Sequence, residues 1–290
     1  MNGGTQAFAE VGSGRAVVLL HGWPQTWYEW RHVAPLLSEE RRVIMPDTRG
    51  LGASDHPEKN FEKRVIAEDV IALLDEIGED SVDLVGHDWG GPIAFAMAMS
   101  APDRVRSLAI VDVVIPGDGR KGGMAQGGRR WHHLFHATPS LPELLVCGRE
   151  RAYLEWFFKE YSETFGAPDS TAVNEYLKHY SRSEVLHAGF EYYRAAKADA
   201  RWNSEMLAKQ GRLQMPVLGV SGGAGRGRGA ETSESLHAVA DNVQSHILPG
   251  CGHLVPEERP NELAGLLREF WSNSSQSSDR ETREASATRQ

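Results

Sequence analysis

The sequence lacks the features that would commit it to a membrane, to nucleic acid or to an oxidising compartment. No apolar run approaches the roughly 20 residues of a membrane-spanning helix. Acidic residues outnumber basic ones, 40 to 31, for a formal net charge of −9, which argues against binding nucleic acid or an anionic membrane surface. Only two cysteines, Cys147 and Cys251, occur in 290 residues, too few for a disulfide framework.

The first residues also lack a basic region followed by an apolar core, the pattern of a secretory signal. Together with two free thiols, this absence makes a cytoplasmic protein the expectation. A length of 290 residues suits one large α/β domain with an insertion, or two small domains.

Short apolar runs alternate with helical patterns in two parts of the chain. Residues 16–20, 82–86 and 108–111 have strand length, and such runs separated by helices predict a parallel sheet covered on both faces. The alternation stops at Pro116 and resumes at Pro216, and the stretch between them is helical and rich in aromatic residues.

We therefore predict an α/β core built from residues 1–114 and 213–271, with a helical cap at 115–212 inserted into it. Residues 272–290 contain no core-forming residues and predict a disordered tail. A sheet domain interrupted by a helical insertion favours one composite domain over two independent ones.

A glycine-flanked aspartate marks the candidate nucleophile. Gly86-His87-Asp88-Trp89-Gly90 matches the G-x-S-x-G nucleophile elbow with aspartate in place of serine. Glycines fit a tight strand-to-helix turn because only hydrogen has room at the flanking positions. The amino end of the following helix would favour an anion. The alternative is an N-cap aspartate that opens an ordinary helix.

A histidine and a second carboxylate could complete the site. His253 lies between the last predicted strand and the last helix, where open α/β sheets hold their ligands. Its orienting acid could follow the strand at 216–221, but Ser221 to Gly229 contains no carboxylate. Asp112, at the end of the strand after the elbow, is the candidate that remains, with a loop aspartate as the alternative.

Four motifs in order resemble the branch of the α/β-hydrolases that holds epoxide hydrolases and dehalogenases. They are His21-Gly22-Trp23-Pro24, Asp47 to Gly52, Gly86 to Gly91 and Gly250-Cys251-Gly252-His253. The resemblance covers about residues 5–271 and implies an α/β-hydrolase fold, with a mostly parallel sheet, helices on both faces and an inserted cap. It also implies an oxyanion hole made by the amides of Trp23 and Trp89.

Two cap segments narrow the resemblance to epoxide hydrolases of the Cif type. Phe190 to Ala195 and Trp131-His132 imply that His132 and Tyr193 are the acids that open the ring. The charge-relay acid of that subgroup corresponds to Asp112, where a glutamate is usual, so the reach to His253 is one methylene shorter. Tyr193 could instead belong to the core of an aromatic helix. His132, His133 and His136 could alternatively bind a metal, since the pair 132 and 136 has i, i+4 spacing.

These residue types fit the hydrolysis of an epoxide to a vicinal diol. A serine would form an ether with an epoxide carbon, which water could not cleave, whereas Asp88 would form an ester. Aspartate is ionised at neutral pH and needs no base for the first step. Ring opening needs an acid, and His253 oriented by Asp112 would activate the water that cleaves the ester. The scheme requires no metal and no organic cofactor.

Two other functions stay open from the sequence. A haloalkane dehalogenase would share Asp88 and His253 but would have no use for proton donors at the leaving group. A haloacid dehalogenase would need arginines near Asp88, and residues 89–92 supply none. A non-catalytic sensor on the same fold is the third possibility. The expected partners are a small, apolar epoxide and water, in a mainly apolar pocket, with neither nucleic acid nor membrane, and a homodimer is possible.

Overall fold

The computed structural model describes residues 4–120 and 130–287. Within this part of the chain, one seven-stranded sheet has the order β1-β3-β2-β4-β5-β6-β7. Strand β1 (Phe8–Val11) pairs antiparallel with β3 (Arg41–Pro46), and the other pairs are parallel. The remaining strands are β2 (Arg15–Leu20), β4 (Val82–His87), β5 (Val105–Val111), β6 (Val217–Gly222) and β7 (Val243–Leu248). The predicted α/β class with a mostly parallel sheet is confirmed.

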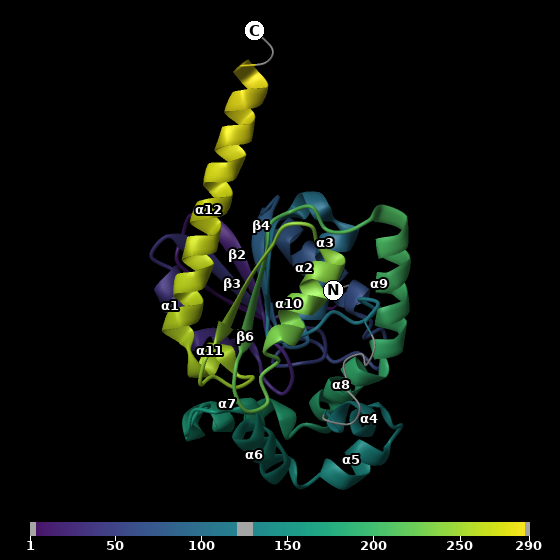
Figure 1. Ribbon diagram of the computed structural model, residues 1–290. Helices are drawn as coiled ribbons and strands as arrows, with labels where there is room; N and C mark the ends of the chain where they lie inside the picture. Colours follow the sequence, from purple (N-terminus) through teal and green to yellow (C-terminus); the bar gives the residue numbers. More distant parts are fainter. Residues whose placement is uncertain (1–3, 121–129, 288–290) are drawn as a thin grey trace.

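Each face of the sheet packs against its own set of helices. Successive side chains of a strand point to opposite faces, so Val18 and Leu20 join one apolar cluster and Val17 and Leu19 the other. The first cluster lies under α2 (Lys63–Ile77), α3 (Gly90–Ser100) and α10 (Ala230–Val239). The second lies under η1 (Trp27–His32), α1 (Ala34–Leu37), α11 (Val255–Glu258) and α12 (Pro260–Ala287). Figure 1 shows the two layers on either side of the strands.

The predicted insertion forms a helical layer at one end of the sheet (Figure 1). It contains α4 (His132–Ala137), α5 (Leu141–Val146), α6 (Glu150–Tyr161), α7 (Ser170–Tyr180) and α8 (Ser183–Arg194). Helix α9 (Ala196–Gln210) then leads back along the core. All six helices fall within the predicted range of 115–212, of which residues 121–129 lie outside the described residues.

Polar contacts join this cap to the core. The Tyr192 hydroxyl donates to Thr48 Oγ1 at 2.9 Å and to the carbonyl of Arg49 at 2.8 Å. Lys63 Nζ forms a buried ion pair with Asp199 Oδ2 at 3.1 Å. These contacts seat the cap over the loops that follow the strands.

The structure differs from the sequence prediction at the C-terminus. Helix α12 runs from Pro260 to Ala287, through most of the segment that the sequence predicts to be a disordered tail. The physical reason is helix propagation, because extending a helix whose first turns are already packed avoids the cost of nucleation. No helix within the described residues is both long and apolar enough to cross a membrane.

Candidate active site

Asp88 lies on a sharp turn between β4 and α3. Its φ is +47°, a left-handed value that is uncommon for a residue with a side chain. A Cβ at Gly86 would lie 2.3 Å from the carbonyl oxygen of Gly90, and one at Gly90 would lie 2.2 Å from the carbonyl oxygen of Leu20. The glycines therefore permit the turn, as predicted. The alternative of an N-cap aspartate is wrong, since the cap residue of α3 is Trp89.

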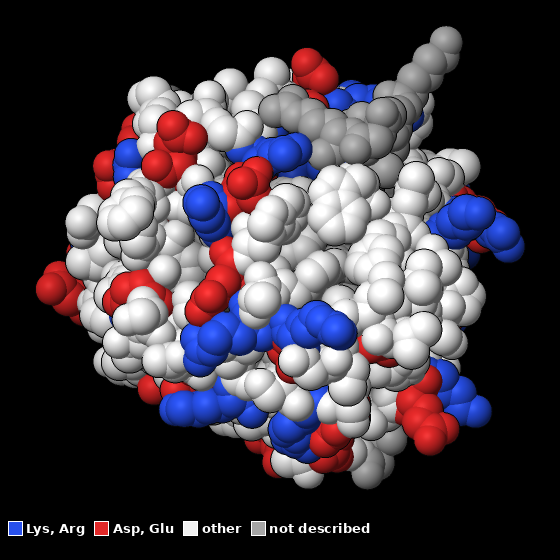
Figure 2. All heavy atoms as spheres, turned by 90° about the horizontal axis from the view of Figure 1, so that it is seen from below, with Lys and Arg blue, Asp and Glu red and all other residues white. Residues whose placement is uncertain are grey.

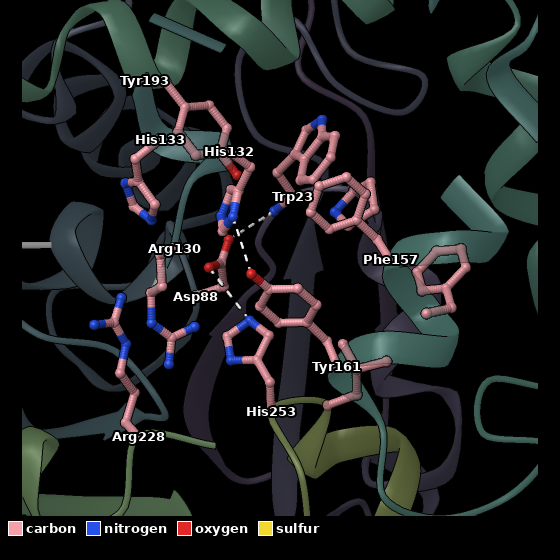
Figure 3. A pocket seen from close by; sticks show the side chains of 13 residues that line it. Trp23, Asp88, Arg130, His132, His133, Phe157, Tyr161, Tyr193, Arg228 and His253 are labelled. Atoms are coloured by element: carbon pink, nitrogen blue, oxygen red, sulfur yellow. Dashed lines mark hydrogen bonds and ion pairs between the residues drawn. The ribbon is translucent and has the colours of Figure 1, made fainter. Parts of the chain in front are cut away.

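The Asp88 carboxylate is held by donors on two sides. Oδ1 accepts from the amide of Trp23 at 3.0 Å, and the amide of Trp89 also bonds to the carboxylate. His253 Nε2 lies 3.4 Å from Oδ2. Burial alone would raise the pKa of Asp88, but the hydrogen bond and charge of His253 hold that pKa well below its ordinary value. The carboxylate is thus ionised and faces a cavity (Figure 3).

Asp112 is the carboxylate that contacts the late histidine. Its Oδ2 lies 2.6 Å from His253 Nδ1. Its Oδ1 accepts from the amides of Gly222 at 2.9 Å and Arg228 at 2.8 Å. Of the two places that the sequence left open, the loop after β6 therefore contributes amides and the end of β5 contributes the acid. A φ of +50° at Asp112 turns the short side chain toward the imidazole.

The cap brings its candidate acids to the same cavity. His132 and Tyr193 both line it, together with Tyr161, a residue that sequence reasoning missed. The Tyr161 hydroxyl lies 2.9 Å from His132 Nδ1. Burial lowers the pKa of His132 far below its ordinary value and raises the pKa of Tyr193 well above it. The imidazole is therefore neutral and the phenol keeps its proton at neutral pH.

The neighbouring aromatic residues have other contacts. Tyr192 is bonded to the core loop 48–49, so Tyr193 is the member of the tyrosine pair that faces the cavity. His136 Nε2 lies 2.6 Å from the Tyr153 hydroxyl, so the two histidines at i, i+4 spacing engage different phenols. Tyr193 packs edge-on against Trp89 with ring centroids 5.0 Å apart.

The cavity is narrow and is lined by both charged and aromatic side chains. It holds about 370 Å³ of space not filled by atoms, part of which is open to solvent. The described residues that line it are Trp23, Pro24, Asp88, Arg130, His132, His133, Phe157, Phe158, Tyr161, Tyr193, Arg228, His253 and Leu254. Trp23, Phe157, Phe158 and Leu254 give the cavity the apolar lining that the sequence predicts. The arginines on one side were not predicted, because the sequence argument considered only arginines next to Asp88.

A buried histidine–glutamate pair behind the elbow was also missed. His87 Nδ1 lies 3.1 Å from Glu29 Oε2, and its Nε2 lies 2.9 Å from the carbonyl oxygen of His253. Burial alone would lower the pKa of His87, but the charge and hydrogen bond of Glu29 raise it to about 9. Since both ring nitrogens face acceptors, His87 is a cation, and its charge helps to keep the pKa of Asp88 low. The only signal in the sequence was a glutamate between Trp27 and Trp30.

Known proteins share both the sequence and the fold. The model of the α/β hydrolase fold family matches residues 15–260. A soluble epoxide hydrolase from Corynebacterium sp. (strain C12) is 34% identical over 284 residues, which cover 93% of this chain and 95% of that protein. A fluoroacetate dehalogenase from Burkholderia sp. is 32% identical over 274 residues, which cover 90% of this chain and 88% of that protein.

A crystal structure of wild-type Cfl2 from Burkholderia cenocepacia superposes with a TM-score of 0.88 at 35% identity, covering 93% of this chain and 92% of the other. The similarity thus extends over both the core and the cap. The chain belongs to the α/β hydrolase fold family, among relatives that include epoxide hydrolases, and is a hydrolase.

Proposed function

We propose that this hydrolase converts an epoxide into a vicinal diol through an ester on Asp88. One observation carries the proposal: an ionised carboxylate on a nucleophile elbow faces a cavity whose opposite side presents the proton donors His132 and Tyr193. The similarity to a soluble epoxide hydrolase over 93% of the chain supports the same reaction class.

In the first step, Asp88 Oδ2 attacks an epoxide carbon and the carbon–oxygen bond of the ring breaks. Oδ1 becomes the carbonyl oxygen of the ester and keeps its hydrogen bond from the amide of Trp23. The departing alkoxide needs a proton, because an alkoxide is a poor leaving group. General acids of this kind contribute typically about 10²–10⁴-fold to a rate.

His132 and Tyr193 supply this proton. A neutral imidazole carries one N–H, and a Tyr161 hydroxyl that donates to Nδ1 would leave the proton of His132 on Nε2. Tyr161 therefore acts as a positioning residue that selects the tautomer. Tyr193, packed against Trp89, is the second donor.

In the second step, His253 removes a proton from water, which attacks Cγ of the ester. The oxyanion that forms on Oδ1 is stabilised by the Trp23 and Trp89 amides. The ester bond then breaks, the departing diol oxygen takes the proton from His253, and the carboxyl proton left on Asp88 returns to the cap donor that opened the ring, which regenerates both groups. Asp112 orients His253 and stabilises its cationic form through the 2.6 Å contact.

Dehalogenation is the second candidate, favoured by the 32% identity to a fluoroacetate dehalogenase. The nucleophile and base would be unchanged, and the donors of the cap would face a departing halide. The two candidates differ in the leaving group, so the substrates themselves distinguish them.

Incubation of the purified protein with styrene oxide, 1-bromobutane and fluoroacetate tests the proposal. Diol from styrene oxide, measured by chromatography, is the expected result. Halide release without diol formation would replace epoxide hydrolysis by dehalogenation. Turnover of none of these, combined with no covalent adduct on Asp88, would favour a binding protein on the same fold.

A further inference from the structure

Two buried arginines lie together on one side of the catalytic cavity. Arg130 precedes α4 of the cap, and Arg228 precedes α10 of the core. They are only 4% and 5% exposed, and both line the cavity with Asp88. In Figure 3 they lie beside each other, next to His133, while Phe157 lies across the cavity beyond Asp88. Arginine is almost never fully buried unless it is paired.

Protein contacts account for part of the hydrogen-bonding capacity of Arg130. Arg130 Nη2 donates to the carbonyl of Arg226 at 2.9 Å, and its buried Nε has no hydrogen-bond partner among the described residues. Arg228 Nη1 lies 3.4 Å from Glu231 Oε2. A guanidinium offers five N–H donors in a planar fork, so Arg130 keeps donor capacity at the cavity, and Arg228 adds a second positive charge there.

The two positive charges also act on each other. Burial is the main cause that lowers the pKa of Arg228 to about 10, and the charge of Arg130 is the next cause. Adjacent buried cations raise the free energy of the folded protein unless anions offset them. The carboxylates of Asp112, Glu231 and Asp88 offset part of the charge, since each raises the pKa of Arg228. The neighbouring His133 adds no charge, because burial lowers its pKa to about 3.

We propose that Arg130 and Arg228 form a subsite for a carboxylate group of the substrate. This inference rests on the proposed function and specifies its substrate class: small epoxy acids, whose ring carbon reaches Asp88 while the carboxylate lies on the guanidinium groups. A carboxylate matches the fork of an arginine with two parallel hydrogen bonds. The narrow cavity favours a small substrate.

The charge arrangement of the site agrees with this assignment. Asp88 is ionised and would repel a second anion, so an epoxy acid needs compensating charge at a distance from the reacting carbon. Arg130 and Arg228 supply that charge inside the cavity. On the outer face of the cap, basic and acidic side chains lie beside one another (Figure 2), so recognition of an anion depends on the buried pair.

The test compares glycidate with glycidamide, which have the same epoxide and differ in charge. We expect the wild type to prefer glycidate in kcat/KM. Arg130→Gln should lower the glycidate-to-glycidamide ratio by about 10–100-fold, the effect of losing one charge-assisted pair. Arg130→Lys keeps the positive charge and should recover part of the glycidate-to-glycidamide ratio. A purely structural role for the guanidinium group would not predict this recovery. Arg201→Gln, which removes an exposed arginine of α9, is the matched control.

The outcomes separate this inference from the proposed function. If the wild type and Arg130→Gln both hydrolyse glycidamide and show no preference for glycidate, that result would overturn the subsite and would leave the proposal of epoxide hydrolysis intact. If neither epoxide reacts, calorimetric titration with lactate and lactamide tests the subsite without turnover. Lactate binding that Arg130→Gln weakens supports it, whereas equal binding of both ligands, or of neither, overturns it.

Discussion

The two sides of the cavity are held in place by different kinds of contact. We call the side that contains Asp88, Asp112 and His253 the core wall, and the side that contains His132 and Tyr193 the cap wall. On the core wall, backbone amides hold the carboxylates, as the amides of Gly222 and Arg228 hold Asp112. On the cap wall, aromatic packing places the side chains, as Trp89 does for Tyr193.

Because of this difference, we expect the two walls to tolerate amino-acid substitutions to different extents. Backbone amides at strand ends are fixed by the sheet, so a reactive group that they hold keeps its position through changes elsewhere. The packing of aromatic rings depends on several side chains at once. Substitutions among them can therefore change which side chains line the cavity. We therefore expect the nucleophile and the base on the core wall to tolerate few changes, and the choice of substrate to depend on the cap and on Arg130.

The largest expected effect comes from the nucleophile on the core wall. Asp88→Ser should lower diol formation by about 10⁴-fold or more, as expected when a catalytic nucleophile is removed. Steady-state assays with styrene oxide measure the effect, with the circular dichroism spectrum as a check of folding. Activity of wild-type size in the variant would eliminate the covalent route.

Removal of the base should divide the reaction into its two steps. His253→Gln should still form the ester but hydrolyse it slowly, so the protein should gain the mass of one substrate. Intact-protein mass spectrometry after incubation with an epoxide checks this. An unchanged mass, with folding intact, would contradict the two-step scheme on the core wall.

Two substitutions of Asp112, the acid that orients His253, should reduce activity to different extents. Asp112→Asn should reduce kcat by about 10²–10⁴-fold, because an amide neither stabilises the imidazolium nor selects its tautomer. Asp112→Glu should retain more activity, yet fall about tenfold, since an added methylene must fit beside two fixed amides in a close-packed site. Equal activity of the glutamate variant and the wild type would mean that the core wall is more adaptable than we infer.

The cap wall should show smaller effects, limited to ring opening. Tyr193→Phe should slow ester formation by about 10–100-fold, since His132 remains as a donor. Ester hydrolysis should change little. Single-turnover kinetics that follow the ester and the diol separately make the measurement. Equal slowing of both steps would remove Tyr193 from its role as an acid.

The smallest effect concerns stability behind the core wall. The pKa of His87 is raised from 6.5 to about 9, so its contribution to folding is fully present below pH 6.5 and is lost as the pH rises through about 9. His87→Gln should therefore flatten the fall in melting temperature between pH 6.5 and 9. Calorimetry across this range provides the comparison, and equal slopes for variant and wild type would show that the pair does not titrate there.

Local sequence signals were sufficient for the scaffold and the elbow. Strands and helices leave periodic apolar patterns, and the glycines beside Asp88 mark a turn whose steric demands are local. The place of His253 after the last strand followed from the chain order of the family. These features could be predicted because each depends on residues close together in the sequence or on the order in which the family's elements follow one another along the chain.

Only the tertiary structure decided which distant side chains meet. Asp112 reaches His253 across 141 positions, from a residue with a left-handed backbone conformation. Three other pairs of neighbouring side chains left no pattern in the sequence: Tyr161 with His132, Glu29 with His87, and Arg130 with Arg228. Their proximity results from how the cap and the helices pack on the sheet, and packing is a property of the whole chain that no local spacing encodes.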